Sequence, residues 1–220
     1  MKSKKKKLTV PNYSLREELI NAISHGVGAL LSIVALVFCI IKSAHLNSPI
    51  LCVSTSIYGA TLIILYTMSC IYHSLSPKLA GKKVLRVLDH CNVYLLVLGT
   101  YIPISLVGVG GTLGWILFAL VTFITIVGIV FTSIDLERFQ AISVICHLIN
   151  GWSILLGVMQ LYNNTGLWGV VLTALGGVFY SVGALIYWLG KKHKYMHCIF
   201  HFFCLLGSLS QFLAIYFFVM

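Results

Sequence analysis

Lys-Lys-His-Lys-Tyr-Met-His-Cys-Ile-Phe-His occupies residues 191–201, and the rest of the chain is organised around this stretch. It begins as a basic loop and continues into the last apolar run of the protein. Three histidines, His193, His197 and His201, recur at intervals of four residues, so on a helix they share one face. His197 and His201 follow the last charged residue and lie inside a predicted membrane span. Imidazoles in lipid are costly without partners, so the stretch predicts further polar residues at the same depth.

The composition is that of an integral membrane protein. Of 220 residues, 59% are hydrophobic and 9% are charged, whereas soluble domains carry about a quarter charged residues. The formal net charge of +10 would suggest nucleic acid as a partner of a soluble protein. Here it indicates orientation, because positive residues collect on cytoplasmic loops. We expect a multi-pass protein of the cell membrane that contacts membrane lipids and no nucleic acid, and no pattern indicates an oligomeric state.

The seven cysteines predict no disulfide framework. They are scattered among the apolar runs, form no Cys-x-x-Cys pair and are odd in number, so we interpret them as small apolar packing residues. Residues 1–7 resemble the basic start of a signal peptide, but Arg16, Glu17 and Glu18 follow instead of an apolar core. We expect this basic segment to be retained. Two roles stay open for it, contact with anionic lipid or a topology signal only.

Seven apolar runs predict seven membrane-spanning helices. Each holds at least about 20 residues, enough to cross roughly 30 Å of hydrocarbon as a helix, whereas β-barrel strands would be about half as long. The runs are residues 19–41, 50–73, 84–107, 113–133, 139–161, 167–189 and 196–219. Their connections are too short for a second domain. The predicted fold class is an all-α membrane protein, with a basic cytoplasmic segment (residues 1–17) and a single seven-helix transmembrane domain (residues 18–220).

The basic residues predict the orientation of this bundle. Fourteen of the 15 lysines and arginines lie in the N-terminal segment, in the second, fourth and sixth loops, and at the start of the third span. These segments fall on one side of the membrane, and the other side has only Lys42. The positive-inside rule therefore predicts a cytoplasmic N-terminus and a C-terminus outside.

Ionisable and amide side chains from four predicted spans fall in one shallow layer. At 1.5 Å per residue they lie within roughly 3–14 Å of the cytoplasmic boundary, although span 2 runs opposite to spans 1, 3 and 7. The outer halves of these spans carry no carboxylate or histidine. The layer consists of Glu18, Asn21 and His25 on span 1, Ser69 and His73 on span 2, Asp89 on span 3, and His197 and His201 on span 7. This asymmetry predicts a functional site.

Three imidazoles beside a carboxylate are the ligand types of a catalytic zinc site, which keeps a fourth position open for water. His197 and His201 can bind one ion from a single helix, and His73 would be the third ligand. Asp89 would orient or deprotonate the water. Ser69 would support the ligands, because no Gly-x-Ser-x-Gly motif marks it as a nucleophile. The alternative is that these side chains are interfacial polar groups hydrogen-bonded across helices.

The other histidines are weaker candidates. His193 lies among lysines and is predicted to be solvated, and His45 lies in an outer loop. His90 follows Asp89 but points about 100° away from it on a helix. His147, in span 5, could line the same cavity or be a satisfied core histidine.

Four motifs occur in order on the expected spans: Glu18-x-x-Asn21-x-x-x-His25, Ser69-x-x-x-His73, Asp89 at the start of span 3, and His197-x-x-x-His201 at the start of span 7. The set resembles the hemolysin III family, the bacterial branch of the progestin-and-adipoQ-receptor superfamily, over nearly the whole chain. The resemblance implies a zinc ion held by His73, His197 and His201, a water linked to Asp89, and Ser69 close by. Eukaryotic members of the superfamily resemble ceramidases, which implies hydrolysis of a lipid amide bond.

The pattern is compatible with three functions. The leading hypothesis is a zinc-dependent hydrolase of a lipid-like amide or ester, with Asp89 as general base and lateral entry of the substrate between helices. The second is a pore-forming or membrane-disrupting cytolysin, although the sequence shows no amphipathic insertion segment and no polar stripe through the bilayer. The third is a receptor-like sensor of membrane state with structural zinc. Structural zinc usually has four protein ligands, so a set of three favours catalysis.

Overall fold

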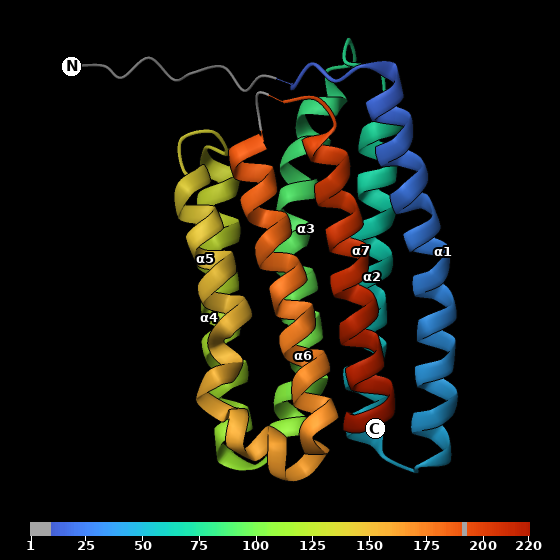
Figure 1. Ribbon diagram of the computed structural model, residues 1–220, viewed down its shortest axis with the longest axis vertical. Helices are drawn as coiled ribbons and strands as arrows, with labels where there is room; N and C mark the ends of the chain where they lie inside the picture. Colours follow the sequence, from blue (N-terminus) through green and yellow to red (C-terminus); the bar gives the residue numbers. More distant parts are fainter. Residues whose placement is uncertain (1–9, 191–192) are drawn as a thin grey trace, which may run out of the picture.

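The computed structural model describes residues 10–190 and 193–220, which form a bundle of helices (Figure 1). No strand occurs within these residues, as the sequence predicts. Seven of the lysines that contribute to the predicted orientation lie outside the described residues: Lys2, Lys4, Lys5, Lys6, Lys7, Lys191 and Lys192.

The helices follow the apolar runs. In chain order they are α1 (Leu15–His45), α2 (Pro49–Ser74), α3 (Gly81–Pro103), the π-helix η1 (Ile104–Val109), α4 (Gly111–Ile134), α5 (Gln140–Trp152), the 3-10 helix η2 (Ser153–Gly157), α6 (Val158–Leu189), α7 (Met196–Ala214) and the π-helix η4 (Ile215–Val219).

Six helical segments of the described chain are long and apolar enough to cross a membrane, one fewer than the predicted runs. The difference lies in Gln140–Leu189, where α5, η2 and α6 form a single helical segment of 50 residues. Residues 162–165, which the sequence predicts as a loop, are helical. The helix is interrupted at Gly166, whose φ of 71° and ψ of −176° are favoured only by glycine. Figure 1 shows the chain reversing its direction between α5 and the later part of α6.

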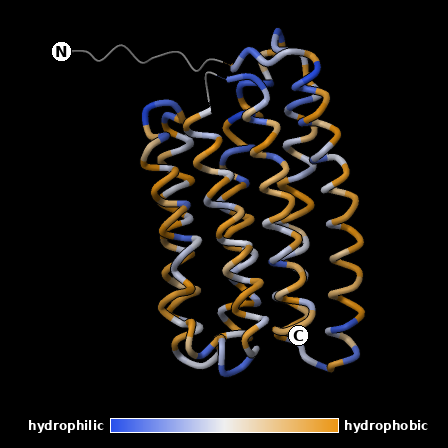
Figure 2. The backbone as a smooth tube through the Cα atoms, in the orientation of Figure 1, coloured by the Kyte–Doolittle hydropathy of each residue, from blue (hydrophilic) through white to orange (hydrophobic). Residues whose placement is uncertain are grey.

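α3 lies at the centre of the bundle and the surface of the bundle is apolar. In the most apolar window of Gly81–Val109, which comprises α3 and η1, 67% of the residues are buried, against 22% for α1. Many leucine, isoleucine and valine side chains on the surrounding helices are exposed. Figure 2 shows that these helices are apolar between more polar ends. Such a surface is stable in lipid, and the chain is a multi-pass membrane protein.

Glu17 joins the start of α1 to the start of α7. Ser14 caps α1 with a capping box: its hydroxyl accepts from the Glu17 backbone N–H (3.3 Å), and its own backbone N–H donates to the Glu17 carboxylate (2.9 Å). α1 therefore begins at Leu15, before the predicted residue 19. The other carboxylate oxygen of Glu17 accepts from the backbone N–H of Tyr195 (2.8 Å), immediately before α7. The first turns of α1 and α7 consequently lie at the same end of the bundle.

Candidate metal centre

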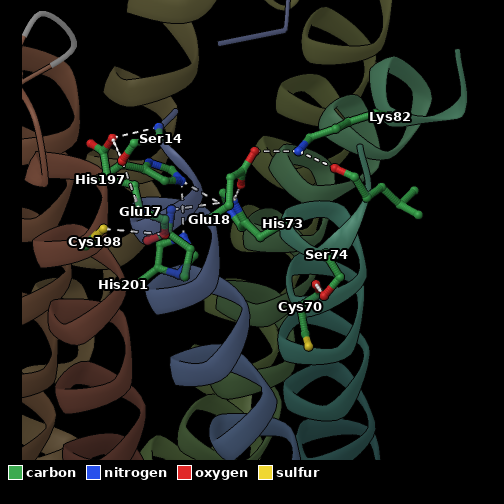
Figure 3. Close-up of polar contacts among 12 residues, drawn as sticks. Ser14, Glu17, Glu18, Cys70, His73, Ser74, Lys82, His197, Cys198 and His201 are labelled. Atoms are coloured by element: carbon green, nitrogen blue, oxygen red, sulfur yellow. Dashed lines mark hydrogen bonds and ion pairs between the residues drawn. The ribbon is translucent and has the colours of Figure 1, made fainter. Parts of the chain in front are cut away.

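Histidines from α2 and α7 form a compact cluster close to the first turns of α1 (Figure 3). His73 lies in the last turn of α2, and His197 and His201 lie on successive turns at the start of α7. Nε2 of His197 lies 3.2 Å from Nε2 of His73 and 3.1 Å from Nε2 of His201. His73 and His201 are buried and His197 is half-buried. The structure thus brings together the three predicted ligands, each with a donor atom within 4.8 Å of the others.

The separation of these nitrogens fits a zinc ion. At Zn–N distances of about 2.0–2.1 Å, a tetrahedral site holds neighbouring nitrogens roughly 3.3 Å apart. The 3.1 and 3.2 Å separations are close to this value. Hydrogen bonds explain the cluster less well, because Nε2 of His197 faces two other ring nitrogens and a neutral imidazole carries only one N–H. His73, His197 and His201 could therefore hold a metal ion.

Glu18 reaches the cluster from α1 and orients His73. Its Oε2 lies 2.6 Å from Nδ1 of His73. When Nδ1–H donates to this carboxylate, Nε2 keeps its lone pair and can bind a metal. Asn21, which is fully buried, places its amide nitrogen 3.5 Å from the same Nδ1. A carboxylate behind a ligand ring holds the ring in one orientation and makes it a better donor.

Lys82 belongs to this network, although the sequence places it in a cytoplasmic loop. It is completely buried, and its Nζ donates to Oε1 of Glu18 (2.5 Å) and to the backbone oxygen of Leu75 (2.7 Å). The loop prediction was wrong at this position because α3 begins at Gly81, which makes Lys82 part of the helix. No local pattern distinguishes it from the exposed Lys83, since its partner Glu18 lies far away in the sequence.

We expect Lys82→Met to lower the free energy of unfolding by roughly 3–5 kcal/mol, because it leaves the buried carboxylate of Glu18 without its cation. The double variant Glu18→Gln/Lys82→Met removes both charges and should recover much of this loss. Thermal unfolding in detergent would compare the two variants, with the exposed Lys83→Met as the control. A double variant no more stable than Lys82→Met would show that the charge pair is not the cause.

A cavity of about 130 Å³ lies beside the cluster. Five residues of the predicted polar layer line it: His25, Ser69, Asp89, His197 and His201. The deeper lining is largely apolar and ends near Gln211, which follows His201 by ten residues, or about 15 Å along α7. Asp89 therefore faces the same space as two of the candidate ligands. The apolar part has the lining that a hydrocarbon chain requires.

A second cavity, of about 720 Å³ and more polar, lies on the other side of the cluster. Gln140, Tyr187 and His197 line both cavities and so lie between them. Tyr13, which precedes α1, stacks on His197 with ring centroids 5.0 Å apart and an angle of 13° between the planes. Burial, reinforced by the neighbouring phenol of Tyr187, raises the pKa of Tyr13, so its hydroxyl stays neutral. Tyr13 covers the cluster on this side, a role that its sequence position does not indicate.

The remaining histidines differ in their surroundings. His90 and His147 line the inner cavity, and His147 stacks on Tyr94 with ring centroids 3.7 Å apart. His193 is exposed before α7, and His45 is exposed at the end of α1. All seven cysteines are free, as the sequence predicts.

Comparison with known proteins shows a family and two named relatives to which the sequence is similar. The family profile "Haemolysin-III related" matches residues 13–212. The protein named Hemolysin-3 from Bacillus cereus is 39% identical over 215 residues, which cover 97% of this chain and 97% of that protein. The Hemolysin-3 homolog of Bacillus subtilis (strain 168) is 39% identical over 206 residues, covering 94% of this chain and 96% of that protein. The resemblance predicted from the ordered motifs is confirmed, and every residue of the polar layer lies within the matched region.

Proposed function

Since this chain belongs to the haemolysin-III-related family of membrane proteins, we propose that it is a zinc-dependent hydrolase of lipid amide or ester bonds. The observation that carries the proposal is the meeting of three imidazole nitrogens at a cavity that Asp89 also lines. Three protein ligands leave a fourth position for water, as in catalytic zinc sites. The substrate is a lipid-like molecule whose hydrocarbon chain occupies the apolar part of the cavity.

The side chains at the cavity have distinct roles in this reaction. Bound zinc would supply a Lewis acid that polarises the scissile carbonyl and activates water. Asp89 accepts a proton from the attacking water as general base. The hydroxyl of Ser69 lines the same cavity beside the carboxylate of Asp89, where it helps to orient that carboxylate. Glu18 keeps His73 in the orientation that zinc binding requires.

We also propose that the chain crosses the membrane seven times, with a cytoplasmic N-terminus and the C-terminus outside. The segment Gln140–Leu189 would span about 75 Å as one straight helix, far more than roughly 30 Å of hydrocarbon. α1 and α7 begin at the same end of the bundle and the C-terminus lies at the other end (Figure 1), an arrangement that supports an odd number of crossings. A phosphatase reporter fused after Met220 should be active only outside the cell, and an inactive, cytoplasmic reporter would contradict the orientation.

We expect the purified protein to contain about one zinc ion per chain and to release a fluorescent acyl chain from an amide-linked or ester-linked lipid. Complete removal of zinc by a chelator should abolish release, and added Zn²⁺ should restore it. Mg²⁺ is the matched control, because it prefers oxygen ligands to imidazole nitrogen. Release that continued in zinc-free protein would refute the proposal.

The names of the two relatives favour a second candidate function, a cytolysin. A cytolysin would permeabilise a membrane whether or not the histidine cluster holds metal. Dye leakage from liposomes, measured with the wild type and with His197→Ala/His201→Ala, separates the two functions. Equal leakage from both proteins would favour the cytolysin, and an absence of leakage would favour the hydrolase.

A further inference from the structure

His25 is a buried imidazole to which the proposed reaction assigns no role. It lies on α1, is 3% exposed, and lines the inner cavity. Neither of its ring nitrogens makes a well-aligned hydrogen bond, although the backbone of His201 lies close to the ring. Leaving a buried donor and a buried acceptor unpaired destabilises a fold, so native proteins usually provide a partner. A ligand in the cavity would be that partner.

His25 does not complete the set of metal ligands. The group of atoms that could hold an ion consists of His73, His197 and His201 and does not include His25. Its ring instead lies flat on the ring of His201, with centroids 3.7 Å apart and an angle of 12° between the planes. Tyr66 borders it at 4.9 Å in an edge-to-face contact. The two nitrogens of His25 therefore lie next to the candidate centre without entering it.

The backbone of α1 holds His25 in this place. Gly28 lies three residues further along, where α1 packs closely against α2 and α7. A Cβ at Gly28 would lie 2.7 Å from Cδ2 of Leu205 and 3.0 Å from Cδ1 of Tyr66. This close approach brings the ring of His25 to the wall of the cavity. Ser69 lines the same cavity, where its hydroxyl lies beside the carboxylate of Asp89.

We propose that His25 binds the polar group of the substrate, donating an N–H hydrogen bond to the carbonyl oxygen of the lipid acyl group. This inference rests on the proposed function and adds a residue that contacts the substrate. A neutral imidazole carries one N–H and one lone pair, and a carbonyl oxygen accepts from the first. Because the ring stacks on His201, the bound carbonyl lies beside the metal centre while the acyl chain extends into the apolar part of the cavity.

His25→Phe tests this role because phenylalanine keeps a ring for the stacking contact and removes both nitrogens. We expect the variant to retain the zinc content and melting temperature of the wild type. It should bind a fluorescent fatty acid, the expected product, about tenfold more weakly, as the loss of one buried hydrogen bond implies. His25→Gln and His25→Leu form a second pair, in which the new side chains have similar volumes. Because only the glutamine side chain can donate a hydrogen bond, His25→Gln should bind the fatty acid more tightly than His25→Leu.

Binding is measured by fluorescence polarisation, independently of turnover. If His25→Phe binds the fatty acid as the wild type does, or if glutamine and leucine bind it equally, the ring serves packing alone and the inference is wrong. Loss of zinc from His25→Phe would also overturn it, because His25 would then act through the metal site. If the wild type releases neither acyl probe, the hydrolase proposal fails, and the binding comparison still decides whether His25 holds an acyl group.

Discussion

Replacing His197 and His201 together with alanine is expected to reduce bound zinc from about one ion per chain to almost none. The two residues supply two of the three nitrogens of the cluster, in which Nε2 of His197 lies 3.1 Å from that of His201 and 3.2 Å from that of His73. His73 alone is too weak a ligand to retain the ion. Acyl release should fall to the background rate. Metal analysis of protein purified without added zinc gives the stoichiometry directly.

His193→Ala is the matched control for this double variant. His193 precedes His197 by the same four residues that separate His197 from His201, but it is exposed before α7 begins. The control should keep its zinc and its activity. Stoichiometric zinc in the double variant, or loss of zinc from His193→Ala, would show that the ion is bound elsewhere.

Asp89→Asn is expected to lower kcat by about 10²–10⁴-fold while zinc content and melting temperature stay close to those of the wild type. Asparagine keeps the size of the side chain and cannot accept a proton from water, and general-base catalysis contributes about this factor. Asp89 is the only carboxylate among the described residues that line the inner cavity, so no nearby group replaces it. Single-turnover measurement of acyl release separates this loss from a change in binding.

Asp135→Asn provides the comparison for Asp89→Asn. Asp135 follows α4, where its carboxylate accepts from the backbone N–H of Arg138 (3.0 Å), and it does not line the inner cavity. Its replacement should leave kcat unchanged. An Asp89→Asn protein with normal kcat and full zinc would exclude Asp89 as the general base.

The membrane class and the helices could be predicted because each depends on local composition. An apolar segment of about 20 residues is helical in lipid whatever its neighbours, since its backbone groups must pair internally. The start of α1 was also predictable from Ser14 and Glu17, which form the Ser-x-x-Glu signature of a capping box, but the apolar run alone indicated a later start. The helical stretch before Gly166 could not be predicted, because Tyr162, Asn163 and Asn164 resemble loop residues in the sequence. Contacts such as the bond from Asn164 to the backbone oxygen of Gly108 (3.0 Å) are made across the bundle.

The depth of the polar layer was predictable for a different reason. The rise per residue along a helix is constant, so distance from the nearest basic loop places His73, Asp89, His197 and His201 at one level. No comparable feature of the sequence shows how each helix is rotated about its own axis. Lys82, one residue from the exposed Lys83, is turned inward toward Glu18 only when α1, α2 and α3 have packed.

By itself, therefore, the sequence determined that this is a helical membrane protein and which residues share a layer near the start of α1. Only the tertiary structure decided that Nε2 of His197 meets those of His73 and His201, that Glu18 stands behind His73 and Lys82 behind Glu18, and that His25 lies on the ring of His201. The physical reason is that composition and helical rise are properties of a single segment and can be read without its neighbours. Which side chains touch depends on how helices distant in the sequence rotate and pack against one another.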